Sequence, residues 1–119
     1  MTTSYAPTRA LNAAAERAGE ELLARFYRAM GDPTRLRLLE FCASEERTGT
    51  ECVAQTMISQ GRVSAHLACL VSCGLLGLRR SGRYAYYRVT DPRVMELIAL
   101  GRGVVADHAA SIAACATVQ

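Results

Sequence analysis

Apolar side chains recur every three or four residues along most of this chain, a spacing that predicts amphipathic helices. Residues 9–30 show this period first. Gly31-Asp32-Pro33 then ends one helix and begins a short buried one, with Asp32 as its N-cap. The polar residues 43–49 predict a loop, and residues 1–8, which show no period, predict a flexible arm.

A pair of short helices joined by a tight turn is predicted over residues 50–73. The first covers 50–56 and Met57-Ile58 form the turn. Ser59 then caps a second helix that runs to the end of this segment. Two helices joined by such a turn, with small polar and basic side chains opening the second, are typical of a helix-turn-helix.

Past Gly74 the apolar side chains recur at every second residue, a spacing that predicts β-strands. Residues 75–89 alternate on both sides of a Ser81-Gly82 turn and therefore predict a two-stranded wing. Thr90 or Asp91, followed by Pro92, starts a last helix over 91–114. The expected fold class is mainly α with a β-hairpin wing, a single winged helix-turn-helix domain over residues 1–119.

The two outer helices, 9–30 and 91–114, carry broader apolar stripes than one core of this size can bury. We therefore expect them to be dimerisation helices that pair across a two-fold axis in a homodimer. No stretch approaches the roughly 18 to 20 consecutive apolar residues of a membrane span, and charged residues such as Glu16 and Arg17 interrupt the N-terminal region. A cytoplasmic protein without a membrane partner is expected.

The net charge of +3 is unevenly distributed. Residues 52–90 contain five arginines and no Asp or Glu, so the positive charge is concentrated in the predicted helix-turn-helix and wing. Such a footprint is typical of a protein that binds a polyanion, although arginines that merely solvate one face would give the same count. Double-stranded DNA is the expected partner.

Candidate DNA contacts lie at the start of the second helix-turn-helix helix and at the wing tip, where side chains can reach base edges or phosphates. They are Gln60, Arg62 and Ser64 on the helix and Arg79, Arg80 and Arg83 on the wing. Val63, Leu67 and Leu70 recur on the opposite helix face and predict its attachment to the core. His66 and the wing tyrosines are interpreted as structural.

Five cysteines are many for a small cytoplasmic protein, where metal binding or thiol chemistry is a better default than a disulfide framework. Cys69 and Cys73 are four residues apart, so one helix face presents both thiols to a shared ion. Cys115 is a candidate third ligand, whereas Cys42 and Cys52 fall on apolar helix faces and predict core packing. Three sulfurs favour a soft ion, Cd(II), Pb(II), Hg(II) or As(III), over Zn(II).

Three motifs in this order resemble the ArsR/SmtB metal-sensing repressors: Gly31-Asp32-Pro33-Thr34-Arg35-Leu36, Val63-Ser64-Ala65-His66-Leu67, and Gly82-Arg83 through Tyr86-Tyr87-Arg88. The resemblance covers about residues 20 to 100. It implies a dimeric winged helix-turn-helix repressor of metal-resistance or efflux genes that leaves its operator on binding metal.

Within that family the chain is most similar to the CmtR-type cadmium and lead sensors. The resemblance places two ligands at Cys69 and Cys73, in the segment HLACLVSCGL, and a third at Cys115, contributed across the dimer. Thr48 and Thr50 stand where another subgroup has a Cys-x-Cys pair, so that second type of site is missing. Mercury and arsenite sensors also belong to this family, which leaves the inducing ion open.

Two alternatives remain: a redox-sensing repressor, and an enzyme or metal-storage protein, which failure to bind any DNA would favour. A redox-sensing repressor of the same fold would oxidise the thiols instead of binding metal. An enzyme is not expected, because the chain shows no paired carboxylates, Ser-His-Asp set or phosphate-binding glycine loop.

Overall fold

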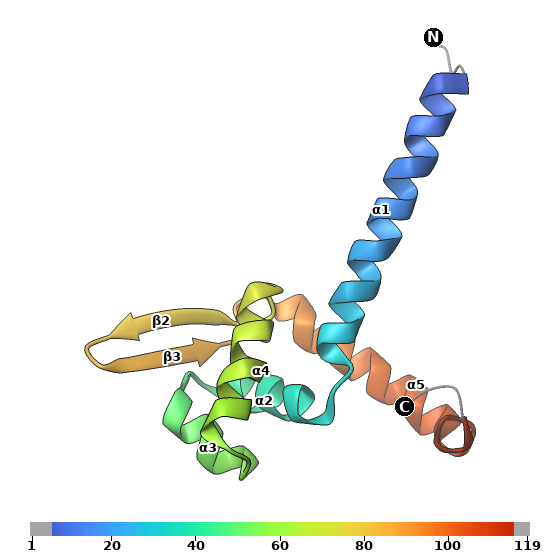
Figure 1. The fold of residues 1–119 in the computed structure, drawn as a ribbon. Coiled ribbons are helices and arrows are strands. Elements are labelled where there is room, and N and C mark those ends of the chain that lie inside the picture. The colour runs from blue at the N-terminus through green and yellow to red at the C-terminus, as the bar shows by residue number, and fades with distance from the viewer. Residues whose placement is uncertain (1–5, 116–119) are drawn as a thin grey trace.

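A computed structural model of the chain describes residues 6–115, with side chains described from Asn12 onward (Figure 1). Helices at both ends flank a small helical body with a projecting hairpin. In chain order the elements are α1 (Ala6–Met30), α2 (Pro33–Ser44), β1 (Arg47–Thr48), α3 (Gly49–Thr56), α4 (Gln60–Ser72), β2 (Gly77–Ser81), β3 (Tyr84–Arg88) and α5 (Pro92–Ala114).

Most helices begin where the sequence supplies an N-cap. Asp32 caps α2 and Asp91 caps α5, each ahead of a proline, and Ser59 accepts a hydrogen bond from the Arg62 backbone at 3.3 Å to cap α4. These three predicted caps are confirmed. The predicted start of α3 at residue 50 is late, because Thr48 and Glu51 form a capping box that includes one more residue.

The predicted flexible arm over residues 1–8 is wrong for residues 6–8, which form the first turn of α1. Pro7 lies in that turn, where a missing backbone N–H costs no hydrogen bond. Residues 1–5 lie outside the described part of the chain.

The predicted loop over residues 43–49 is also wrong, since α2 extends to Ser44 and Arg47–Thr48 forms the strand β1. β1 pairs antiparallel with β3 and makes a third strand in the order β1-β3-β2. A two-residue strand is too short to show an alternation of apolar and polar residues, so only its pairing with β3 identifies it. The wing itself is confirmed, with Gly82 at φ 61° in the tight turn between β2 and β3.

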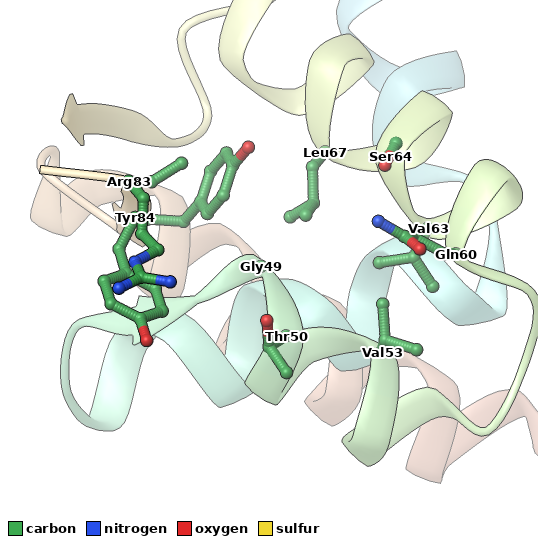
Figure 2. Close-up of a pocket in the computed structure, with 11 residues that line it drawn as sticks. Gly49, Thr50, Val53, Gln60, Val63, Ser64, Leu67, Arg83 and Tyr84 are labelled. Atoms are coloured by element: carbon green, nitrogen blue, oxygen red, sulfur yellow. The ribbon is translucent and has the colours of Figure 1, made fainter.

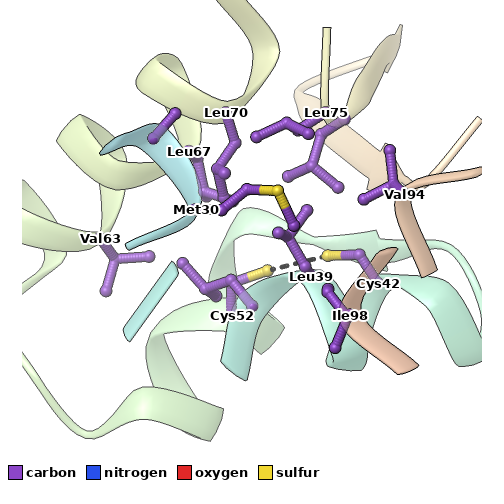
Figure 3. Packing of buried hydrophobic residues seen from close by; sticks show 13 residues of the cluster. Met30, Leu39, Cys42, Cys52, Val63, Leu67, Leu70, Leu75, Val94 and Ile98 are labelled. Carbon is purple, nitrogen blue, oxygen red and sulfur yellow. Dashed lines mark hydrogen bonds between the residues drawn. The ribbon is translucent and has the colours of Figure 1, made fainter. Parts of the chain in front are cut away.

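The core lies where α2, α3 and α4 meet the start of α5 (Figure 3). Val63, Leu67 and Leu70 are buried and attach α4 to it, as predicted. Cys42 of α2 and Cys52 of α3 are buried as well, which confirms their predicted packing. The whole buried apolar set comprises Ala29, Met30, Leu38, Leu39, Cys42, Cys52, Val63, Leu67, Leu70, Leu75, Leu76, Val94 and Ile98.

α1 and most of α5 extend away from this core (Figure 1). The radius of gyration is 18.4 Å, whereas a compact domain of this length has about 13.5 Å. The apolar stripes of the two helices stay exposed and continue outward from the core. Their large exposed members are Leu22, Leu23, Tyr27, Leu100, Val104, Val105 and Ile112.

By length and composition α5 is apolar enough to cross a membrane, although it carries Arg102 and Asp107. The prediction concerned an unbroken apolar run, which α5 does not contain because Arg102 and Asp107 interrupt it; the mean hydropathy of the helix nevertheless passes this test. Val94 and Ile98 at the start of α5 are buried in the domain core. The rest of its apolar surface is a face that a protein partner can also cover.

Candidate functional site

An open cleft of about 260 Å³ lies between α3, the start of α4 and the wing (Figure 2). Gln60 and Ser64 face it from α4, and Arg83 and Tyr84 face it from the wing tip. The cleft is lined without any Asp or Glu. Its polar side chains are therefore hydrogen-bonding groups and one cation, which suits a polyanionic ligand.

The position of these side chains follows from the way α4 is packed. Val63 and Leu67 are buried on its inner face, which turns Gln60 and Ser64 toward the cleft and solvent. Arg62 is exposed as predicted but does not line the cleft, because two residues of helix rotate it by about 200° from Gln60. The predicted helix set is thus split between two flanks of α4.

The wing also separates its predicted arginines. Arg80 lies opposite Ala85 in the strand register, and Ala85 lines the cleft, so Arg80 is on the cleft face of the hairpin. Arg79 lies on the other face, where its Nε and Nη2 donate to the Glu46 carboxylate at 3.1 and 2.7 Å and its guanidinium stacks over the Tyr86 ring.

Glu46 is a residue that sequence reasoning missed, since 33 positions separate it from Arg79. The hydrogen bonds from Arg79 lower the pKa of the Glu46 carboxyl. The ion pair thus occupies Arg79 in the middle of β2, whereas Arg80 and Arg83 have no carboxylate partner among the described residues. Of the wing arginines, these two are oriented best for phosphate contacts.

The cysteine pair lies at the other end of the same helix. Cys69 is half-buried and Cys73 is exposed at the C-cap of α4. Partial burial and the neighbouring Cys69 thiol raise the pKa of Cys73, while the charge of Arg35 opposes that shift. Arg62, His66, Cys69 and Cys73 follow one another at spacings of four, three and four residues, so they form one stripe along α4.

Cys115 is exposed at the C-cap of α5. Among residues 6–115 of one chain, no three His, Cys, Asp or Glu side chains come together in a group able to hold a metal ion. The structure of one chain therefore brings together Cys69 and Cys73 of the predicted ligand set and leaves Cys115 apart.

Arg35 links this stripe to the end of α1. Its Nε donates to the Ala29 carbonyl at 2.6 Å and its Nη2 to the Arg28 carbonyl at 3.2 Å. Its Nη1 lies 3.2 Å from Nδ1 of His66. His66 thus takes part in a structural contact that joins α4 to the junction of α1 and α2, in keeping with its predicted role.

Residues 32–76, which span α2 to α4, match the family described as bacterial regulatory protein, arsR family. The chain is 53% identical over 92 residues to a probable mercury resistance operon repressor of Streptomyces lividans, an alignment that covers 77% of this chain and 74% of the relative. The chain belongs to the ArsR family. It is thus a DNA-binding transcriptional repressor and not an enzyme, as expected.

This ArsR-family chain is also 36% identical over 72 residues to the regulator CmtR of Mycobacterium bovis, across 60% of this chain and 61% of CmtR. A solved structure supports the fold. The homodimeric winged helix-turn-helix domain of Mb0332, also from Mycobacterium bovis, superposes with a TM-score of 0.68 at 31% identity and covers 91% of this chain and 92% of that one. The predicted winged helix-turn-helix fold is confirmed.

Proposed function

We propose that this repressor is a cytoplasmic homodimer that binds double-stranded operator DNA when metal-free and leaves it on binding a soft heavy-metal ion. The observation that carries the proposal is that α4 holds both candidate sites. Its first turns present Gln60 and Arg62, and its last turn presents Cys69 and Cys73. The relatives named for mercury resistance and as CmtR support a metal as the effector.

In the DNA complex, the start of α4 enters the major groove and the wing contacts the flanking backbone. Gln60, Arg62 and Ser64 supply amide, guanidinium and hydroxyl groups for base edges and phosphates. Arg80 and Arg83 supply phosphate contacts from the wing, and Arg79 joins them if a phosphate displaces Glu46.

The exposed stripes of α1 and α5 support a two-fold dimer. Leu100 is 71% exposed and Leu22 is 66% exposed, and an apolar groove between Tyr27, Leu36 and Val104 runs beside them. Burial of such a face by a second copy removes apolar area from water and places two recognition helices at the spacing of two half-sites. Mb0332 is described as homodimeric, which agrees with this arrangement.

Cys69 and Cys73 fit a thiolate-bound ion because one helical turn separates them and both are accessible enough to exchange protons with solvent. Since one chain gathers only these two, we assign the third sulfur to Cys115 of the partner subunit. A soft ion supplies strong bonds to thiolate sulfur, and three sulfurs without imidazole suit Cd(II), Pb(II), Hg(II) or As(III).

Ligation at the end of α4 is coupled to DNA through the helix itself. Cys69 lies seven residues from Arg62, about 10 Å along the axis, and the intervening turns are hydrogen-bonded and packed on the core. When the ion joins Cys69 and Cys73 to Cys115 of the partner subunit, it therefore reorients the whole of α4, the helix that contacts the DNA bases. A coupling of about 1 to 3 kcal/mol changes DNA affinity by roughly 5 to 150-fold.

The test is a fluorescence-anisotropy titration of the reduced protein onto its own promoter DNA, first without metal and then with each of Cd(II), Pb(II), Hg(II), As(III) and Zn(II). We expect tight metal-free binding that one or more soft ions weaken and Zn(II) does not. Binding that no ion changes would contradict the metal-sensing part of the proposal. Failure to bind the promoter at all would contradict the repressor's assignment to that operator.

Site variants then locate the ion. Cys69→Ser and Cys73→Ser leave metal-free DNA binding intact and abolish release by Cd(II), while Ser72→Ala, on the same turn, changes neither. A mixed dimer of a Cys69→Ser/Cys73→Ser subunit and a Cys115→Ser subunit retains one complete site only if ligation crosses the dimer. Cadmium stoichiometry of one per mixed dimer supports that geometry, and zero contradicts it.

The redox alternative makes a different prediction about peroxide. A redox-sensing repressor of this fold is released from DNA by peroxide in the absence of metal, and a reductant reverses the release. Under the metal-sensing proposal, peroxide without metal leaves the protein bound to DNA, and reversible release would favour the redox function instead.

A further inference from the structure

The two buried cysteines form a second sulfur pair that the proposed sensing mechanism does not use. Cys42 of α2 and Cys52 of α3 are 1% and 0% exposed, and their Sγ atoms lie 4.0 Å apart. Figure 3 shows the two sulfurs directed toward one another across the boundary between the helices. We propose that this pair is a separate, two-coordinate binding site for a soft divalent ion of the Hg(II) class.

The sulfur separation suits an ion better than it suits a disulfide. With metal–sulfur bonds of about 2.3 Å, a separation of 4.0 Å corresponds to an S–metal–S angle of about 120°, and a linear arrangement needs about 4.6 Å. The pair therefore reaches linear coordination by moving apart by about 0.6 Å. A disulfide instead requires the sulfurs to approach to about 2.05 Å, half their present distance.

The surroundings restrict which ion fits. Within the described residues no third His, Cys, Asp or Glu joins the pair, which excludes the four ligands that Zn(II) favours and the three sulfurs that suit Cd(II), Pb(II) and As(III). The charge of the complex further restricts which ion fits. Two thiolates with one divalent ion make a neutral unit, whereas a monovalent ion leaves a net negative charge in the apolar core, where an unpaired charge is costly.

Binding is a balanced exchange. The two S–H bonds break, two metal–sulfur bonds form, both protons go to solvent and the ion keeps its oxidation state. The hydrogen bond between the two thiols, together with burial, holds the pKa of Cys42 above its usual range, and the same hydrogen bond lowers the pKa of Cys52. The Arg47 guanidinium, half-buried over the Phe41 ring, adds a smaller contribution that favours deprotonation of both thiols. Only an ion with very high affinity for sulfur therefore displaces both protons.

Backbone carbonyls of the two cysteines connect the site to the wing and to the end of α3. The Cys42 carbonyl accepts a hydrogen bond from Val89, the residue after β3, at 3.4 Å. The Cys52 carbonyl accepts one from the Thr56 hydroxyl at the end of α3, at 3.0 Å. An ion between the sulfurs therefore cross-links α3, the first helix of the helix-turn-helix, to α2, whose Cys42 carbonyl is hydrogen-bonded to the base of the wing.

The experiment uses the full-length Cys69→Ser/Cys73→Ser/Cys115→Ser variant, which keeps Cys42 and Cys52 and removes the other three thiols. The probe is HgCl2 added in the presence of excess glutathione, with native mass spectrometry as the readout and Cd(II) as the comparison ion. We expect one Hg(II) per chain with the loss of two protons, a higher melting temperature, and no retained Cd(II). No retained Hg(II), or retention of both ions alike, overturns the proposal.

The matched control adds Cys42→Ala to that variant and is expected to weaken Hg(II) binding at least tenfold; equal binding overturns the proposal. If the control does not fold, protection is measured instead on the triple variant. Rapid denaturation in N-ethylmaleimide labels both Cys42 and Cys52 without Hg(II) and neither after Hg(II) loading, and full labelling in both samples overturns the site. Because release of wild-type protein from DNA by Cd(II) tests only Cys69 and Cys73, failure here is distinguishable from failure of the proposed function.

Discussion

Asp91 combines two roles at the start of α5. Its carboxylate accepts a hydrogen bond from the Arg93 backbone at 3.0 Å and pairs with the Arg93 guanidinium at 2.7 Å. These hydrogen bonds, the side-chain one first, lower the pKa of Asp91 from 3.8 to about 2. The folded state thus binds this proton less readily than the unfolded state does, so the ionised form contributes stability.

The lowered pKa predicts a pH dependence. The contribution of Asp91 is fully present above about pH 4 and is lost as the pH falls toward 2. In urea denaturation from pH 6 to 2.5, we expect the midpoint of the wild-type protein to fall more than that of Asp91→Asn. Asp107→Asn, which alters an exposed aspartate of the same helix with no ion pair to any described residue, serves as control. An unchanged pH profile in Asp91→Asn would contradict the assignment.

At the scale of elements, Arg35 joins three helices through one guanidinium. It lies at the start of α2, donates to the last carbonyls of α1 and contacts His66 of α4. Lysine keeps the charge but not the planar fork that reaches these groups together. Arg35→Lys is therefore expected to lower the free energy of unfolding by about 1 to 3 kcal/mol, measured by urea denaturation.

The control for that experiment is Arg37→Lys, two residues along the same helix. Arg37 is exposed and has no side-chain hydrogen bond among the described residues, so a loss near zero is expected. Equal losses in both variants would show that the contacts of Arg35 add nothing to stability.

The wing gives a second prediction at this scale. Arg80 and Arg83 lie toward the cleft without carboxylate partners among the described residues, whereas Glu46 holds Arg79. Arg80→Ala and Arg83→Ala are each expected to weaken binding to all DNA sequences and to reduce the slope of log affinity against log salt by about one. Arg79→Ala is expected to have a smaller effect on that slope.

Fluorescence anisotropy across a salt series measures these slopes. Arg17→Ala removes the same charge from α1, which projects away from the wing, and is expected to leave the slope unchanged (Figure 1). A slope lowered equally by Arg79→Ala and Arg83→Ala would contradict the separation of the two wing faces.

At the scale of the whole molecule, the apolar stripes of α1 and α5 are exposed in a single chain and are expected to be covered by a second copy. Leu100 belongs to the stripe of α5, lines the apolar groove beside Tyr27 and is 71% exposed. A charge there does not disturb the core of one chain, but it must be desolvated when a second copy covers the stripe. Leu100→Glu is therefore expected to convert the dimer to a folded monomer and to lower operator affinity about tenfold or more, since one half-site remains.

Size-exclusion chromatography with light scattering, together with circular dichroism, measures both parts of this prediction. Ala43→Glu adds the same charge to an exposed position near the end of α2 and is expected to stay dimeric. A Leu100→Glu protein that remains dimeric would exclude this stripe as the interface.

The sequence by itself determined the elements whose signals are local. The helical spacing of apolar residues predicts α1, α4 and α5. The N-caps Asp32, Ser59 and Asp91 predict where helices begin, because a cap side chain bonds to a backbone N–H within three residues of itself. The position of Cys69 and Cys73 on one face of α4 also follows from spacing alone.

Only the tertiary structure decided the features that depend on distant partners. β1 exists because β3 lies beside it, Arg79 is held by Glu46, and the sulfurs of Cys42 and Cys52 meet because α2 packs on α3. The physical reason is the same in each case. A hydrogen bond, an ion pair or a sulfur contact depends on a distance in space, and a single sequence carries no record of which distant residues the packing brings within that distance.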